Sequence, residues 1–82
     1  MESDYQKMPW EIVKIIEVAN CLASSGDSGA STGERIAAAF VLNRLEFLPA
    51  SYPDVVDAWD RLDDEWQDYV RLIKRDYRHF IE

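Results

Sequence analysis

The chain is poor in the residues that build cross-links and metal sites. Its 82 residues include one cysteine, Cys21, and one histidine, His79. A single cysteine cannot form an intramolecular disulfide, and one cysteine with one histidine cannot supply the usual ligand set of a zinc site. The sequence therefore predicts no disulfide framework, no metal site and no other cofactor.

Helix breakers and long apolar runs are also scarce. There are three glycines and three prolines, and the longest apolar run, Ile36–Leu42, has seven residues, far fewer than the ~20 needed to span a bilayer. The first eight residues carry Glu2 and Asp4 and lack the basic and apolar parts of a secretory signal. These features predict a soluble, cytoplasmic protein that does not bind a membrane.

The sequence contains few basic residues. Nine Lys and Arg residues against 16 Asp and Glu residues give a net charge of −7 at pH 7, which disfavours direct binding to nucleic acid. The hydrophobic content of 48% is high enough for a globular core. A chain of this length is expected to form one helical domain over residues 1–82, with residues 1–8 frayed.

The first half of the sequence contains two helical patterns. Apolar residues from Ile12 to Ala23 recur at helical spacing and predict a helix over about 10–24, with Trp10 and Val13 off the main apolar stripe. After a loop rich in Gly and Ser, Ser31 and Glu34 form a capping-box pattern that begins a helix over 32–47. Residues 36–42 are apolar on most sides, so this helix is expected to be central and buried.

The second half is interrupted by Pro49 and Pro53, which prevent a continuous helix. A short helix is expected over 53–62, with Val55, Val56, Trp59 and Leu62 on its apolar side. An amphipathic helix is expected over 65–80, capped by Asp63 or Asp64, with Gln67 completing a capping box. No segment alternates like a strand, so the predicted fold class is all-α, a compact four-helix bundle.

Acidic residues are concentrated in the second half. Seven of the 16 acids lie in one run with Arg61 as its only base: Asp54, Asp57, Asp60, Asp63, Asp64, Glu65 and Asp68. Much of this run has local explanations, because acids at a helix start cap free N–H groups and suit the helix dipole. Helical spacing also predicts the ion pairs Asp57–Arg61 and Asp68–Arg71. Asp60 has no such explanation.

The functional interpretation of the run is an acidic face for a basic partner, formed by Asp57, Asp60, Asp64 and Asp68 and widened by Asp54 and Asp63. Carboxylates three or four residues apart on a helix are ~5–6 Å apart along its axis, a spacing comparable with that of nucleic-acid phosphates. Trp10 is the candidate exposed apolar anchor. Four bases follow the run on what is expected to be one arc of the last helix: Arg71, Lys74, Arg75 and Arg78.

In size, charge and the Asp54–Asp68 run, the chain resembles the small acidic inhibitors of phages and mobile elements, the anti-CRISPR and DNA-mimic class. The resemblance implies a non-enzymatic protein that binds the basic surface of a protein that handles nucleic acid. The alternative is a small homodimeric structural or regulatory subunit that self-associates through apolar helix surface. An enzyme or a small-molecule binder would instead need a concave pocket with convergent polar groups.

Overall fold

The computed structural model describes residues 8–26 and 29–81, which form four α-helices and no strand. The helices are α2 (Trp10–Ser25), α3 (Thr32–Leu42), α4 (Val55–Arg61) and α5 (Asp64–Asp76). Two short 3₁₀ helices, η1 (Leu45–Phe47) and η2 (Arg78–Phe80), follow α3 and α5. The predicted all-α, four-helix bundle is confirmed. The frayed segment was predicted over residues 1–8; residues 1–7 lie outside the described part, and Met8, which is described, is buried in the core.

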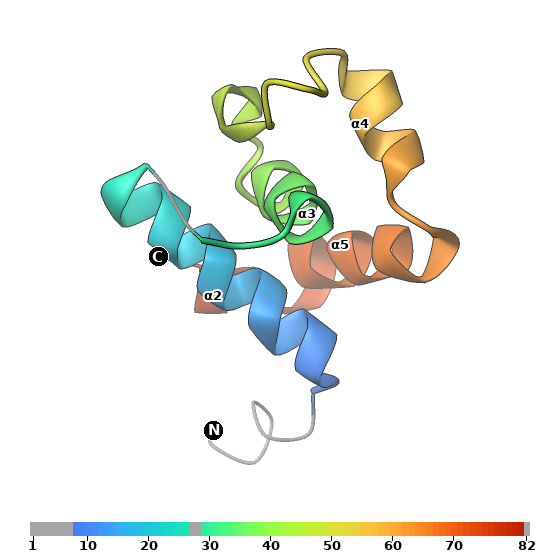
Figure 1. The fold of residues 1–82 in the computed structure, drawn as a ribbon. Helices are drawn as coiled ribbons and strands as arrows, with labels where there is room; N and C mark the ends of the chain where they lie inside the picture. The colour runs from blue at the N-terminus through green and yellow to red at the C-terminus, as the bar shows by residue number, and fades with distance from the viewer. Residues whose placement is uncertain (1–7, 27–28, 82) are drawn as a thin grey trace.

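α3 occupies the centre of the bundle and contacts the three other α-helices (Figure 1). Ile36, Ala37, Ala38 and Ala39 have no exposed surface. The small alanine side chains let neighbouring helices approach the α3 backbone closely. The prediction that the apolar segment of α3 is central and buried is therefore confirmed.

α2 buries most of its predicted stripe, namely Ile12, Ile15, Ile16, Ala19 and Leu22, and also Val18, whereas Ala23 at the end of the stripe is only half-buried. It ends at Gly26, whose φ of 78° places it in the left-handed region. Glycine adopts this conformation without a Cβ clash. The backbone N–H of Gly26 donates to the carbonyl oxygen of Leu22 at 2.7 Å, so the helix has a stable C-terminal cap.

The start of α3 follows the prediction, but its end does not. The N–H of Glu34 donates to Oγ of Ser31 at 3.3 Å, and the N–H of Ser31 donates to Oε1 of Glu34 at 3.2 Å. The predicted end at residue 47 is wrong, because Asn43 adopts a left-handed conformation with φ 59° and closes the helix at Leu42. Asparagine is among the few residues that tolerate this region. Nε of Arg35 donates to the carbonyl oxygen of Phe47 at 2.9 Å and holds η1 beside α3.

α4 and α5 are both shorter than the predicted ranges of 53–62 and 65–80. α4 begins after the Asp54 cap, and α5 ends at Asp76 before η2 begins. The predicted apolar side of α4 is only partly correct. Ala58 and Leu62 are buried, whereas Val55 and Val56 are 40% and 63% exposed. Residues four apart lie on one side of a helix, so docking through Ala58 and Leu62 turns Val56 outward.

Gln67 on α5 bonds to the end of α4, a contact that the sequence did not predict. Asp63 is the cap of α5, and its Oδ1 accepts a hydrogen bond from the N–H of Trp66 at 2.9 Å. The predicted capping box of Asp64 with Gln67 is therefore wrong. Nε2 of Gln67 instead donates to the carbonyl oxygens of Trp59 at 2.9 Å and Leu62 at 3.2 Å. Gln67 thus satisfies carbonyl groups at the end of α4.

Candidate functional site

Two acids of the Asp54–Asp68 run serve as helix caps. Oδ1 of Asp54 accepts hydrogen bonds from the N–H groups of Val56 at 2.8 Å and Asp57 at 3.3 Å. Asp63 caps α5 as described above. Each cap satisfies N–H groups that have no partner within the helix, a contribution of ~1 kcal/mol. The positions of Asp54 and Asp63 are therefore explained by the fold alone.

Asp68 has a local partner, as its spacing predicts. Its Oδ1 accepts a hydrogen bond from Nη1 of Arg71 at 2.9 Å. The guanidinium of Arg71 also lies 5.3 Å from the centre of the Trp59 ring, so it joins α5 to α4 by a cation–π contact. The other predicted pair is wrong: within residues 8–26 and 29–81, Asp57 and Arg61 form no ion pair.

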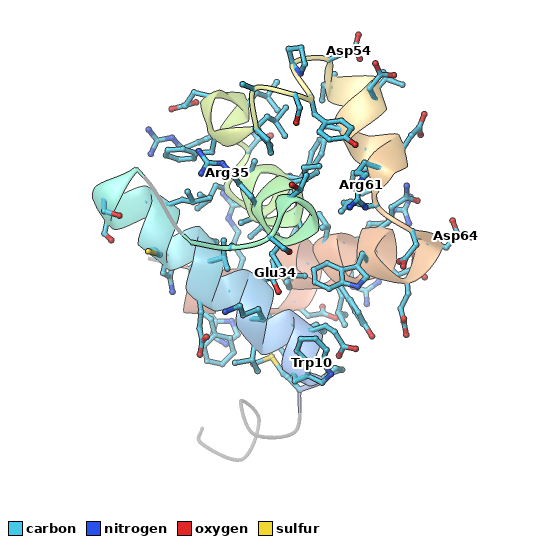
Figure 2. The ribbon with its side chains drawn as sticks, viewed as in Figure 1. Trp10, Glu34, Arg35, Asp54, Arg61 and Asp64 are labelled. Atoms are coloured by element: carbon cyan, nitrogen blue, oxygen red, sulfur yellow. The ribbon has the colours of Figure 1, made fainter. Side chains whose placement is uncertain are left out.

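Within the described residues, three carboxylates of the run have no side-chain partner, although Asp57 and Asp64 lie in the first turns of α4 and α5, where a negative charge suits the helix dipole. Asp57, Asp60 and Asp64 are exposed, and in the described part of the chain their side chains accept no hydrogen bond and form no ion pair. α4 and α5 run in different directions (Figure 1), so the structure does not align Asp57, Asp60, Asp64 and Asp68 in one straight row. Asp54 and Asp64, near opposite ends of α4, both point away from the bundle (Figure 2).

The outward side of α4 combines charge with apolar surface. We call this surface, formed by Val56, Asp57 and Asp60, the α4 outer face. Val56 is one of the four exposed large hydrophobic residues in the described chain. Its position was missed by sequence reasoning, although Ala58 and Leu62, four residues apart, could have indicated which side is buried. A surface that places an exposed apolar side chain beside charged ones can bind another protein.

Trp10 is the most exposed of these hydrophobic residues, at 67%. It lies at the start of α2 and is drawn at the edge of the bundle in Figure 2. The next residue, Glu11, affects the ionisation of Tyr69 on α5 together with Glu65 and Asp63. Trp10 is exposed on a different part of the surface from α4 (Figure 2).

The acidic surroundings of Tyr69 are expected to be measurable by titration. Partial burial, hydrogen bonding to Glu65 and the negative charges of Glu11, Glu65 and Asp63 raise the pKa of Tyr69 above its ordinary value of 10.0, because each disfavours the phenolate. The difference between the absorbance titrations of the wild type and Tyr69→Phe isolates Tyr69 and should show this raised pKa. The substitution Glu11→Gln should lower the pKa of Tyr69. Since the folded-state pKa is raised, the associated stability is fully present below pH 10 and is lost as the pH rises through the folded pKa.

An unchanged Tyr69 titration in Glu11→Gln would contradict this placement of α2 against α5. Glu17→Gln is the matched control, since Glu17 is an exposed acid of the same helix that is not among the groups acting on Tyr69. It should leave the titration of Tyr69 unaltered.

The predicted basic arc is only partly correct, because Arg71, Lys74 and Arg75 lie on α5 whereas Arg78 does not. Arg71 and Arg75 pair with Asp68 and Asp76, the latter at 3.0 Å. Nζ of Lys74 donates to the carbonyl oxygen of Phe40 at 3.1 Å and caps the end of α3. Arg78 lies beyond α5, in η2. Most of these bases therefore serve local contacts within the fold.

A pocket of about 260 Å³ lies between the ends of α2, α3 and η2. Its lining combines four apolar residues with two arginines: Ala23, Val41, Leu42, Ile81, Arg44 and Arg78. The guanidinium of Arg44 pairs with Oε2 of Glu46 at 2.8 Å and lies 4.8 Å from the centre of the Phe47 ring. Because arginine stays protonated at physiological pH, this lining favours an anionic group.

Comparison with known proteins identifies no relative: no family model, no curated protein and no solved structure matches the chain. Across the described residues, no three or more His, Cys, Asp or Glu side chains are grouped so that they could hold a metal ion. None of the helices in that part of the chain is long and apolar enough to cross a membrane. The functional argument therefore rests on the surface of this molecule.

Proposed function

We propose that this chain is a non-enzymatic, acidic protein-binding protein that uses the α4 outer face to dock onto a basic surface of another protein. The partner is a cytoplasmic protein that handles nucleic acid, and the chain acts as an inhibitor of the anti-CRISPR or DNA-mimic type. In this proposal the chain contacts neither nucleic acid nor membrane directly.

The observation that carries the proposal is the pair of exposed carboxylates on α4 whose side chains have no hydrogen-bonding or ionic partner in the described part of the chain. Among the described residues, Asp57 and Asp60 cap no helix and pair with no base. Their separation of three residues corresponds to ~5 Å along the helix axis, which suits a groove that accommodates successive phosphates. A partner that supplies lysine or arginine would give them the ionic contacts that the chain itself does not provide.

Val56 and the net charge add two further properties. The Val56 side chain, 63% exposed, can be buried by a partner, and burial of apolar surface favours association. The net charge of −7 attracts a basic surface over distance, which speeds association and makes it sensitive to salt. The proposal therefore predicts fast, salt-dependent binding.

The test is a comparison of wild type and the double variant Asp57→Lys, Asp60→Lys. Protein recovered from source-cell extract by the wild-type chain is identified by mass spectrometry, and its affinity for both chains is measured at low and high salt. We expect the variant to bind at least ~10-fold more weakly at low salt, because two attractive contacts become repulsive. We also expect the difference to shrink at high salt.

The matched control is Glu17→Lys, Glu46→Lys. Both acids are exposed and lie outside the α4 outer face, on α2 and η1. Each change from a carboxylate to lysine adds two positive charges, so both double variants have net charge −3 in place of −7. If the two variants bind equally well, net charge rather than the α4 outer face determines binding, and the proposal is wrong.

A further inference from the structure

The exposed side of α5 has a regular charge pattern. Asp64, Asp68, Arg71 and Arg75 follow one another at spacings of four, three and four residues. At 3.6 residues per turn these positions fall within an arc of ~60°. We call this arc the α5 charged stripe. The same alternation of four and three defines the contact seam of two paired helices in a coiled coil.

The signs along the α5 charged stripe are arranged symmetrically about the middle of the helix. The two acids occupy the first half and the two arginines the second half, at matching distances from the midpoint between Tyr69 and Val70. When a second copy of α5 lies antiparallel to the first, Asp64 faces Arg75 of the partner subunit, and Asp68 faces Arg71 of the partner subunit. A parallel arrangement would place like charges together.

The α5 charged stripe is accessible in the single chain. α5 packs on α2 and α3 through its other side, where Val70 and Ile73 are buried. The side chains of Asp68, Arg71 and Arg75 are 76%, 60% and 74% exposed. Their ion pairs within the chain are surface pairs, which contribute little stability, so exchanging Asp68 or Asp76 for an acid of a second copy has a small energetic cost.

The stripe also contains a hollow that can receive an acidic side chain. It has a volume of about 290 Å³ and is lined by Asp68, Arg71, Leu72 and Arg75. The two arginines supply hydrogen-bond donors, and half-buried Leu72 supplies apolar contact. In the antiparallel arrangement Asp64 of the partner subunit lies opposite Arg75 at this hollow, and the two-fold symmetry repeats the contact.

We propose that the α5 charged stripe is a self-association surface through which two copies of this chain form an antiparallel, two-fold dimer. The proposal goes beyond the docking of the α4 outer face, because the α5 charged stripe lies on another helix and its occupant is a second copy of this chain. A single helix of 13 residues buries less than the ~800 Å² per partner of a typical stable complex. The dimer is therefore weak and reversible, with a dissociation constant of ~0.1–1 mM.

The proposal is tested by sedimentation of the full chain over a concentration series, with the wild type and two charge-reversal variants. The salt concentration is ~0.15 M, which screens the repulsion between whole molecules. Asp64→Lys places lysine against Arg75 of the partner subunit, and Arg75→Glu places glutamate against Asp64 of the partner subunit. We expect each variant alone to have a dissociation constant at least ~10-fold higher than that of the wild type. An equimolar mixture of the two variants should dimerise again, because each chain then carries the complement of the other.

The control variant is Glu65→Lys, which makes the same charge change in the same first turn of α5 but off the stripe. It should dimerise like the wild type, and circular dichroism should show equal helix content in all the chains. The proposal fails if the wild type remains monomeric at millimolar concentration. It also fails if Glu65→Lys weakens dimerisation as strongly as Asp64→Lys, or if the mixture of the two stripe variants does not dimerise.

Discussion

Replacing Ile36 with alanine should lower the free energy of unfolding by ~3–4 kcal/mol. Ile36 has no exposed surface and lies on the central helix. The substitution removes buried apolar contacts and leaves a cavity that neighbouring residues fill only in part. A domain of this size has a total stability of ~4–12 kcal/mol, so this loss is a large fraction of the total. Urea unfolding followed by circular dichroism measures it.

Leu45→Ala is the matched control for Ile36→Ala. It also shortens a four-carbon side chain to a methyl group, but Leu45 is 50% exposed on η1. We expect a loss below ~1 kcal/mol, because less surface is transferred from water on folding. Equal losses in the two variants would show that α3 is not the packed centre of the fold.

The second large effect is expected from Trp59→Ala, which should loosen the attachment of α4. The Trp59 ring lies 5.0 Å from the Phe40 ring in an edge-to-face arrangement, and the guanidinium of Arg71 covers it. Removing the indole loses both contacts and part of the apolar surface between α3 and α4. We expect a loss of ~2–3 kcal/mol. Amide hydrogen exchange should become faster in α4 than in α2 and α3.

Trp10→Ala serves as the control for Trp59→Ala. It removes the same side chain from a position that is 67% exposed, so the stability should change by less than ~1 kcal/mol. If the amide hydrogens of α4 exchange at the wild-type rate in Trp59→Ala, the helix is held by Ala58 and Leu62 alone. The expected role of Trp59 would then be incorrect.

The sequence predicts the helices well where periodicity and caps agree. The Ser31–Glu34 capping box and the apolar stripe of α2 have strong local signals, and both occur in the structure. The end of α3 has only a weak signal, because Asn43 is compatible with a helix interior as well as with the left-handed cap. The predicted role of Gln67 in a capping box was wrong for a different reason. Its partners, Trp59 and Leu62, depend on how two helices meet, which a local pattern does not contain.

In the candidate surface, too, contacts between residues close in sequence were predicted, whereas features that depend on how the helices pack were not. The caps Asp54 and Asp63 and the pair Asp68–Arg71 could be predicted from spacing. The outward position of Val56 was not predicted, because it depends on the rotation of α4 about its axis after docking, for which the spacing of Ala58 and Leu62 is the one local signal. The direction of α4 relative to α5 is also tertiary information, and it separates Asp57 and Asp60 from the stripe that contains Asp64 and Asp68.

The modest attachment of α4 has a consequence for how such a protein can diversify. α4 has seven residues, and it is held mainly by Ala58, Trp59 and the adjoining Leu62. The other positions can change without disturbing the centre of the bundle, where Ala37–Ala39 leave no room for variation. Descendants of one ancestral sequence can therefore change the exposed surface of α4 while α2, α3 and α5 preserve the fold.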